Sequence, residues 1–320
     1  MALLAGCGGA AHTISAHAGQ HTARATRSKA SKPVSVRVAY HRLFSLPAPL
    51  RDPASAAIGP DRFVLLGGLD ASDVSAAGIE VASLRRVLRS YALPLAQHDA
   101  QAAALDGKVY VFGGGSLSEL DHILSFDPAT GAVHQVGQLP HSQSDVAVAA
   151  LGQTAYIVGG YDGVDWLNTI LAWRPGSQVR VAGHLPVGLR YSAVAAADGR
   201  LLVIGGSTPT RASRAIYSFD PASGTVRRIG RLPRPITHAS AATLGSSVYL
   251  IGGRGDLDNA QTAAVWAIDP RTGQVRVAGR LPTPLSDSGV LTVGGRIVVA
   301  GGLEPTGATG STVAELVPAR

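Results

Sequence analysis

The sequence predicts an all-β protein: a six-bladed β-propeller of four-stranded antiparallel blades, the last blade closed by an N-terminal strand. Two markers, a glycine pair and a Leu-Pro pair, each recur six times along the 320 residues, in steps of 46 to 49. The glycine pairs begin at Gly67, Gly113, Gly159, Gly205, Gly252 and Gly301, and the Leu-Pro pairs at Leu46, Leu93, Leu139, Leu185, Leu232 and Leu281. A period of 20 to 50 residues is typical of solenoids and propellers. Two markers with the same period define one repeating unit.

The unit that starts at Leu232 contains four expected strands. A run rich in small residues, 240–244, is followed by a turn and by an apolar run, 248–251, that ends on the glycine pair. A polar loop leads to the third strand, 265–268, and the turn 269–273 leads to the fourth, 275–277. The small side chains of the first strand suit strands that crowd around a common axis. The unbroken apolar second strand is expected to be covered on both faces, as in sheets that stack radially.

Two kinds of turn separate these strands. Asp106-Gly107 and Asp198-Gly199 lie between the first and second strands, and such pairs suit the positive φ angles of tight hairpins. The pattern Asp-Pro-x-Thr/Ser-Gly recurs at 127–131, 220–224 and 269–273. Its proline presets φ and its glycine accepts a left-handed conformation, which favours a turn before the fourth strand.

The two ends of the repeat predict how the ring closes. After Gly301-Gly302 the chain has one more expected strand, 312–316, and no fourth strand. Residues 35–38 have the same pattern as 274–277, which precede a Leu-Pro pair of their own. We therefore expect the N-terminal segment to complete the last blade, which removes an open sheet edge.

The glycine pair, the apolar strand with an aromatic residue, the Asp-Pro turn and the Leu-Pro pair together resemble the Kelch repeat, over about residues 35–320. The resemblance implies one propeller blade per repeat, in a divergent bacterial form. It is weaker in the blade from Leu46, where residues 82–84 replace the Asp-Pro turn. The family's tryptophan in the last strand is replaced by Val136, Val181, Ile229 and Val277.

The N-terminal residues 3–7, Leu-Leu-Ala-Gly-Cys, resemble a bacterial lipobox, whose cysteine carries a lipid. Cys7 is the only cysteine of the chain, so no intrachain disulfide can use it. The apolar run before it is shorter than a signal peptide needs, so either the true start lies upstream or the likeness is accidental. We predict a truncated signal or lipobox-like segment at 1–7, a disordered basic spacer at 8–34 and the propeller at 35–320. This organisation favours the extracytoplasmic face of the bacterial membrane; a soluble cytoplasmic or secreted protein is the alternative.

The charge distribution argues against nucleic acid as a partner. The formal net charge is +7, but residues 1–51 contain seven basic residues and no acidic one. The rest of the chain has 21 basic and 21 acidic residues. Residues 52–320, which make up most of the propeller, therefore lack the net positive charge that binding to phosphates requires. The basic arm suits an anionic membrane surface or a solvated tether.

A ring of candidate ligand-binding residues is expected where the inner strands begin. Positions 14 and 15 before each glycine pair give Asp52/Pro53, His98/Asp99, Ser144/Asp145, Arg190/Tyr191, Thr237/His238 and Ser286/Asp287. Pseudo-symmetry places them around one mouth of the central channel. The ligand-binding candidates are Asp52, His98, Asp99, Asp145, Arg190, Tyr191, His238 and Asp287. They either form a polar pocket for a small hydroxylated or charged ligand, or only solvate the strand ends.

The loops after the glycine pairs are expected on the same face, and they carry the loop-face candidates Tyr161, Asp165, Trp166, Arg211 and Arg254. Exposed aromatic rings at Tyr161 and Trp166 would stack on a sugar. The alternative is structural, since Tyr-Asp-Gly after the glycine pair resembles an ordinary Kelch blade. Arg211 and Arg254 are candidates for contact with a partner or serve solubility alone.

No cofactor or metal is predicted. His12, His17 and His21 lie in a spacer without fixed geometry, and His98 and His238 with their neighbouring aspartates are a weaker metal alternative. Some Kelch propellers resemble galactose oxidase, whose copper site has a thioether-linked tyrosine and cysteine. The propeller has no cysteine, so that cofactor cannot form. Nucleophile elbows and phosphate-binding loops are absent from the sequence.

These observations favour a non-enzymatic, extracytoplasmic module that binds a protein or a small carbohydrate-like ligand through its loop face. The alternative is a sugar-active enzyme, because six-bladed bacterial Kelch proteins include sialic acid mutarotases. That resemblance implies acid, base and carboxylate-binding roles among Asp99, Asp145, Arg190, His238 and Asp287. The spacing assigns no catalytic role to any one of them.

Overall fold

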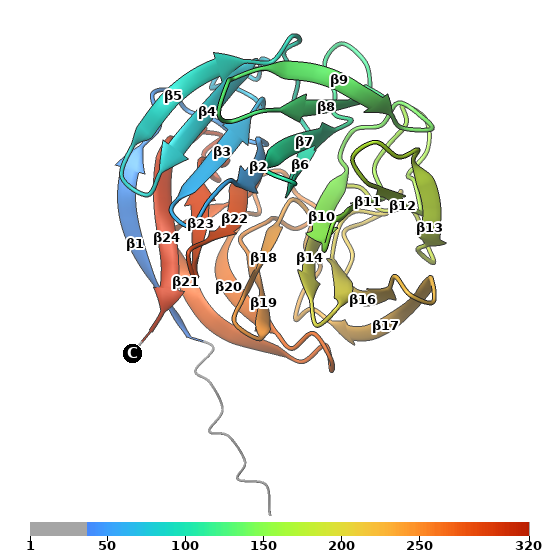
Figure 1. The fold of residues 1–320 in the computed structure, drawn as a ribbon. Coiled ribbons are helices and arrows are strands. Elements are labelled where there is room, and N and C mark those ends of the chain that lie inside the picture. The colour runs from blue at the N-terminus through green and yellow to red at the C-terminus, as the bar shows by residue number, and fades with distance from the viewer. Residues whose placement is uncertain (1–36, 320) are drawn as a thin grey trace, which may run out of the picture. The chain divides into compact units, whose positions relative to one another are not determined.

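The computed structural model describes residues 37–319, which form a ring of six four-stranded antiparallel sheets (Figure 1). Each sheet is one blade, and its innermost strand contacts the innermost strands of both neighbouring blades, with β22 against β2 closing the circle. The predicted six-bladed propeller is therefore confirmed. Cys7 and the expected spacer 8–34 lie outside the described residues.

The strands follow the predicted order from the channel outwards. The innermost strands are β2 (Ala54–Ala57), β6 (Gln101–Leu105), β10 (Ala147–Leu151), β14 (Ala193–Ala197), β18 (Ser240–Leu244) and β22 (Gly289–Val293). The second strands are β3 (Arg62–Leu66), β7 (Lys108–Phe112), β11 (Thr154–Val158), β15 (Arg200–Ile204), β19 (Ser247–Ile251) and β23 (Arg296–Ala300). They are almost wholly buried, as their continuous apolar character predicts.

The outer half of each blade consists of a buried third strand and an exposed fourth strand. The third strands are β4 (Gly78–Ser83), β8 (His122–Phe126), β12 (Thr169–Trp173), β16 (Ala215–Asp220), β20 (Thr262–Ile268) and β24 (Thr312–Pro318). The outermost strands are β5 (Val87–Ala92), β9 (Val133–Gln138), β13 (Arg180–His184), β17 (Thr225–Arg231), β21 (Val275–Leu285) and β1 (Val38–Ser45). Residues 37–319 contain no helix long and apolar enough to cross a membrane.

The turns before the outermost strands use side-chain oxygens to satisfy backbone N–H groups. Asp127 Oδ1 accepts hydrogen bonds from the N–H of Ala129, at 2.9 Å, and of Thr130, at 3.4 Å. In the first blade, which lacks the Asp-Pro pattern, Ser83 Oγ accepts from the N–H of Arg85, at 3.2 Å, and of Arg86, at 3.3 Å. Serine thus makes the same local turn by the weaker hydroxyl version of the contact, which explains why the sequence pattern is lost there while the blade is kept.

The hydrophobic core consists of clusters between neighbouring blades. Within the described part of the chain there are six, and each draws its buried residues from two adjacent blades. The leucines of all six Leu-Pro pairs are buried, which explains their recurrence. Val136, Val181 and Val277, at the positions of the family's tryptophan, are exposed. Large aromatic residues of the third strands pack between blades instead, as Trp173 does edge to face with Tyr110, ring centroids 4.8 Å apart.

Each glycine pair joins its blade to the next one. The segment between a Leu-Pro pair and the following inner strand is here called the approach segment. The N–H of Gly68 donates to the carbonyl of Gln97, in the approach segment of the next blade, at 2.8 Å. A Cβ atom on Gly67 would lie 2.5 Å from that same oxygen, and Gly67 has a φ of +62°. No other residue fits such a close approach without displacing the backbone.

This interblade bond occurs at every glycine pair. The second glycines Gly68, Gly114, Gly160, Gly206, Gly253 and Gly302 donate to the carbonyls of Gln97, Gln143, Leu189, Ile236, Leu285 and Leu50, all at 2.8 to 2.9 Å. The last bond, from Gly302 to Leu50, links the sixth blade to the first. The glycine pairs are therefore joints between blades.

The sixth blade is closed by the N-terminal segment, as predicted. Strand β1 pairs antiparallel with β24, with Val38 opposite Pro318 and Ser45 opposite Thr312. Figure 1 shows β1 lying along β24 at the outside of the ring. The strand extends beyond the predicted segment 35–38 because its pairing continues up to the Leu-Pro pair, and its Val38 is buried against the fifth blade.

Removal of β1 is expected to destabilise the propeller and to make it self-associate. A chain that starts at Leu46 loses the packing of Val38, Tyr40 and Phe44 and exposes the edge of β24. Each buried apolar side chain of this size contributes about 1.5–3 kcal/mol, so the melting temperature should fall by roughly 10 °C or more. Thermal unfolding and size-exclusion chromatography measure both effects. A chain that starts at Ser35 is the control, and equal melting temperatures for the two chains would contradict the assigned role of β1.

Candidate functional site: the channel mouth

The interblade bonds place two residues of every blade at one mouth of the central channel. In the first blade, Leu50 accepts the interblade bond, and the next residue, Arg51, forms a backbone bridge with Leu69, which directly follows the glycine pair of that blade. The other five blades have the same arrangement. The residues in the position of Arg51 are the rim residues: Arg51, His98, Ser144, Arg190, Thr237 and Ser286. The next residue in each blade has a φ between +48° and +59°. These are the ring residues: Asp52, Asp99, Asp145, Tyr191, His238 and Asp287.

Backbone hydrogen bonds connect the ring residues across blade boundaries. The N–H of Asp287 donates to the carbonyl of His238 at 3.0 Å, and the N–H of Asp52 donates to the carbonyl of Asp287 at 2.8 Å. Bonds of the same kind lead from Asp145 to Asp99, from Tyr191 to Asp145 and from His238 to Tyr191, at 3.0 to 3.2 Å. The left-handed backbone that these bonds need is uncommon outside glycine, and aspartate is among the residues that tolerate it. The ring is therefore a fixed backbone frame.

The spacing rule is wrong by one residue in the first blade. It predicts the pair Asp52/Pro53, whereas the structure places Arg51 on the rim and Asp52 in the ring. The reason is the inner hairpin: β2 and β3 are joined by residues 58–61, whereas β6 and β7 are joined by Asp106 and Gly107 alone. Arg51 is thus a site residue that the sequence count misses, and the unusual Pro60-Asp61 turn is the signal that could have revealed it.

The ring encloses little free space. A cavity of about 50 Å³ is lined by the side chains of the ring and by the first residues of the inner strands. A second cavity of about 90 Å³ shares some of these residues and continues along the inner strands. Such volumes hold a few water molecules and are far below the roughly 300–1,000 Å³ of typical small-molecule sites. The ring can hold one polar group of a ligand, whose body must remain in the mouth.

Three of the four carboxyl groups of the ring have raised pKa values. Burial, together with the charges of Asp287 and Asp99, raises the pKa of Asp52 well above its ordinary value. Burial and the neighbouring Asp145 do the same to the pKa of Asp99, and burial also raises the pKa of Asp287. Like charges this close cannot all ionise. The protonated form of these three groups is therefore favoured, and a protonated carboxyl group donates a hydrogen bond as well as accepting one.

Asp145 is held in an ion pair with Arg190. The guanidinium Nε of Arg190 donates to Asp145 Oδ2, and the carboxylate is almost fully buried. The Arg190 guanidinium lies over the ring of Tyr161, 4.1 Å from its centroid, and 5.2 Å from that of Trp166. Tyr161 and Trp166 pack edge to face, with centroids 5.2 Å apart. These two half-buried loop aromatics thus hold Arg190 over the ring by cation–π contacts, and neither is a freely exposed stacking platform.

His238 is a neutral, oriented group in the blade that follows Arg190 and Tyr191. Its imidazole stacks on Tyr191 with centroids 3.7 Å apart, and burial with the nearby Arg254 lowers the pKa of His238 well below its ordinary value. Arg254 Nη2 lies 3.2 Å from His238 Nε2. Because arginine only donates, Nε2 accepts and the proton sits on Nδ1. Burial also raises the pKa of Tyr191, so its phenol stays protonated.

The other two arginines at the mouth, Arg51 and Arg254, are also paired with aspartates. Arg51 Nη2 lies 2.6 Å from Asp73 Oδ1 in a neighbouring loop, and Arg254 pairs with Asp258. His98 contacts Ser75 through Nδ1 at 2.8 Å, and its Nε2 lies 3.6 Å from Asp99 Oδ2. Three arginines therefore surround the mouth, each fixed by an aspartate. Asp165, unlike these groups, is exposed on the loop tip.

Among the described residues, the buried atoms His238 Nδ1 and Ser192 Oγ at the ring have no hydrogen-bond partner. The carboxyl group of Asp145 shares a hydrogen bond with that of Asp99, and the carboxyl group of Asp287 shares one with that of Asp52. Buried polar groups without partners are costly and are normally satisfied by water or by a ligand. Within residues 37–319, no three His, Cys, Asp or Glu side chains are grouped to hold a metal ion. The polar atoms at the ring that have no partner are suited to hydrogen bonding with a ligand.

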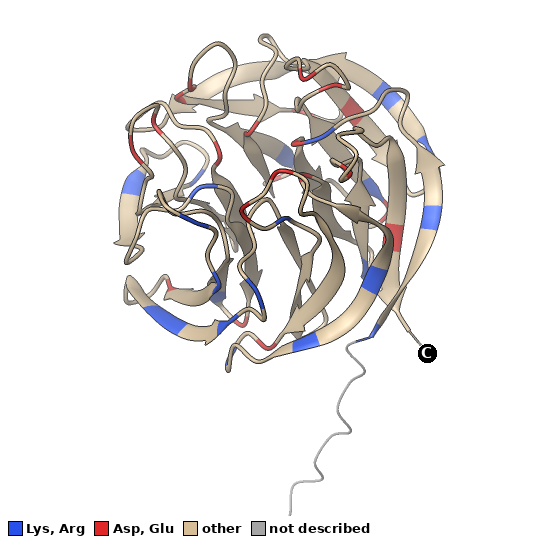
Figure 2. Cartoon of the chain, turned by 180° about the vertical axis from the view of Figure 1, so that it is seen from behind, with Lys and Arg blue, Asp and Glu red and all other residues tan. Residues whose placement is uncertain are grey.

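The loops around the mouth are mainly acidic and carry exposed apolar residues, whereas arginines surround the mouth itself. The loops that follow the glycine pairs, 69–77, 115–121, 161–168, 207–214, 254–261 and 303–311, contain nine acidic and three basic residues. Figure 2 shows many of the acidic residues in the loops, whereas basic residues occur along the outermost strands. Four of these loops carry an exposed apolar residue: Val74, Leu117, Val164 and Leu257.

Comparison with known proteins shows Kelch motifs in a propeller fold. Residues 188–233 and 235–282 each match the Kelch motif. These are the segments of the fourth and fifth blades. No curated protein matches the sequence significantly. The structure is similar to the solved structure of YjhT, with a TM-score of 0.74 over 86% of this chain and 97% of that chain, at 16% sequence identity. At that identity the similarity shows the shared fold alone.

Replacement of Asp52 by asparagine is expected to stabilise the protein at alkaline pH. The pKa of Asp52 is higher in the folded chain than its value of about 3.9 in an unfolded one, so stability is lost as the pH rises through the folded pKa. Asparagine tolerates the same left-handed backbone and carries no charge. Asp52→Asn should therefore raise the melting temperature at pH 8 by about 2–4 °C per kcal/mol gained, with little change at pH 4.

Thermal unfolding at pH 4, 6 and 8 measures this effect. Asp61→Asn, at an exposed turn of the opposite face, is the matched control and should leave the pH dependence unchanged. A lower melting temperature of Asp52→Asn at pH 8 than of the unaltered protein would show that the ring carboxylate is stabilising when ionised.

Proposed function

We propose that this protein is a non-enzymatic interaction module that binds a partner protein through its loop face. The observation that carries the proposal is the set of exposed apolar side chains at the loop tips. Val74, Val164 and Leu257 are 57%, 76% and 68% exposed, and Leu117 is fully exposed. A single exposed apolar residue is ordinary, but equivalent loops of four blades present one each around a common mouth. Grouped exposed apolar residues are typical of protein contact sites.

The negative charge of the loops indicates the kind of surface that the partner presents. Nine acidic residues against three basic ones make the loop face a complement for a surface that carries basic as well as apolar side chains. The mouth accommodates a single polar group, because the ring cavity measures about 50 Å³. His238 Nδ1 carries a proton and has no hydrogen-bond partner among the described residues, so an acceptor atom of the partner would be satisfied there.

Substitution of the loop tips should abolish binding of the partner. We expect Leu117→Asp/Val164→Asp/Leu257→Asp to raise the Kd at least about tenfold, which corresponds to the loss of about 1.4 kcal/mol. A photo-cross-linking residue at Thr306, on an exposed loop of the same face, captures the partner in the native cells, and the yield of cross-linked product measures binding.

The matched control places the same charge on the circumference of the ring. Val136→Asp/Val181→Asp/Val277→Asp changes three exposed valines of the outermost strands and should keep the cross-linking yield. Equal yields from the two triple variants would contradict a binding role of the loop tips.

A second candidate is a sugar-active enzyme that resembles a sialic acid mutarotase. The observation that favours it is the raised pKa of Asp99 beside Asp145, which is ion-paired with Arg190. A neutral acid next to a carboxylate is an arrangement that suits general acid–base chemistry. The substrate would lie in the mouth with one group in the ring. If this candidate is right, the purified protein accelerates the exchange of N-acetylneuraminate anomers followed by NMR, and Asp99→Asn abolishes the acceleration. Exchange at the buffer rate would remove this candidate.

A further inference from the structure

A second site lies on the fourth blade, outside the channel mouth. A cavity of about 580 Å³ opens between the loop 207–214, strand β17 and Pro235. Its volume lies within the range of roughly 300–1,000 Å³ of small-molecule sites. None of the ring or rim residues lines it, so it is separate from the mouth described above. We refer to it as the blade 4 groove.

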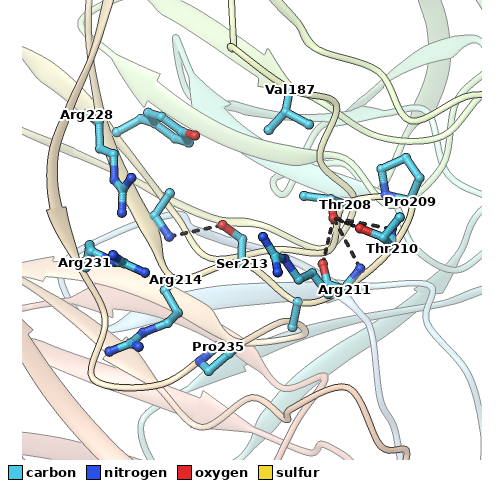
Figure 3. A pocket seen from close by; sticks show the side chains of 13 residues that line it. Val187, Thr208, Pro209, Thr210, Arg211, Ser213, Arg214, Arg228, Arg231 and Pro235 are labelled. Carbon is cyan, nitrogen blue, oxygen red and sulfur yellow. Dashed lines mark hydrogen bonds between the residues drawn. The ribbon is translucent and has the colours of Figure 1, made fainter.

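The groove is lined by four arginines and by no acidic residue of the described chain. Figure 3 shows Arg228 and Arg231 extending into it from β17 on one side and Arg211 from the loop on the other. Arg214 completes the set. The carboxylate of Asp256, which does not line the groove, accepts a hydrogen bond from the backbone N–H of Ala212. Four guanidinium groups without a counter-charge in the lining make this a strongly electropositive cavity.

The arginines differ in how they are held. Arg214 is fixed, since Nε donates to the carbonyl of Leu232 at 2.9 Å and Nη2 to that of Pro233 at 2.8 Å. Within residues 37–319, no side-chain hydrogen bond or ion pair holds Arg211 or Arg231, and both are exposed. The groove therefore has one fixed arginine and two arginines, Arg211 and Arg231, whose guanidinium donors are available to a ligand.

The rest of the lining favours a ligand with a hydroxylated body. The hydroxyl of Ser213 accepts from the N–H of Ala215 at 3.1 Å, which leaves its own proton to donate. Thr208 Oγ1 donates to the carbonyl of Arg211 at 2.9 Å and so fixes the loop. Val187, Pro209 and Pro235 supply apolar walls. Charged, hydroxyl and apolar contacts thus occur in one cavity.

The surroundings reinforce the positive charge. The six outermost strands of the described propeller contain eight arginines and no aspartate or glutamate (Figure 2). Three of the eight, Arg227, Arg228 and Arg231, belong to β17. Among the six loops defined above, 207–214 alone has basic but no acidic residues. The fourth blade is therefore the place where a basic circumference and a basic loop meet.

We propose that the blade 4 groove binds the phosphate or sulfate ester of a small hydroxylated molecule. A tetrahedral ester group presents three terminal oxygens and can accept from two guanidinium forks at once, whereas a carboxylate presents only two oxygens in one plane. The hydroxyls and the apolar walls then contact the body of the molecule. The proposal is independent of the function assigned to the loop face.

Isothermal titration of the full chain at low ionic strength tests this proposal, with glucose 6-phosphate, glucose 6-sulfate, inorganic phosphate and glucose as probes. We expect saturable binding of one or both esters with a Kd of about 1 mM or lower, weaker binding of inorganic phosphate and none of glucose. Arg211→Gln/Arg231→Gln should raise the Kd of the ester at least about tenfold, because it removes the two guanidiniums that are available to a ligand.

Arg89→Gln, on the outermost strand β5 of the first blade, is the matched control and should leave the Kd unchanged. Thermal unfolding checks that every variant is folded. Absence of saturable binding of both esters would overturn the proposal, as would equal weakening by Arg89→Gln, which indicates a diffuse charge effect. Tight binding of single-stranded RNA without binding of either ester would overturn it as well, in favour of a polyanion surface.

Discussion

The propeller depends on one hydrogen bond that recurs in every blade, from the second glycine of each pair to a carbonyl in the approach segment of the next blade. The bond from Gly68 to Gln97 is 2.8 Å long, and the one from Gly302 to Leu50 is 2.9 Å. It fixes the distance between blades at the level of the backbone, so the side chains between them can pack against a constant frame. It also sets the position of the next two residues, which become the rim and the ring. Architecture and candidate site therefore have a common origin.

The sequence predicts most of this architecture because its requirements are local. A backbone approach that excludes a Cβ atom demands glycine, as at Gly67, and a buried position at the start of each repeat demands an apolar residue, as at Leu93. These requirements place glycine and leucine at fixed spacing in the sequence, so the number of blades and the role of the N-terminal strand follow from counting the repeats. The extent of β1 up to Ser45 does not, because it depends on pairing with a strand at the other end of the propeller.

The site is predicted less completely. Asp99, Asp145, Tyr191, His238 and Asp287 are found by counting because their inner hairpins have two-residue connections, whereas Arg51 is missed because the first hairpin is longer. The hold of Tyr161 and Trp166 on Arg190 joins two neighbouring blades, and the blade 4 groove joins a loop to an outer strand. No spacing within one repeat records contacts of this kind. They arise from side chains that meet only once a whole blade has folded or, for Arg190, once two neighbouring blades have packed together.

The pairing of β1 with β24 has a consequence for how the protein reaches this structure. Strand β1, at the start of the propeller, can pair only after β24, at its end, has been synthesised. The circle therefore cannot be completed until nearly every blade has been synthesised. Contacts between such distant parts of a chain slow folding, and until then the outer edge of the sixth blade has no partner. Assembly and closure are thus separate events in time, and the last step converts an open row of sheets into a ring without ends.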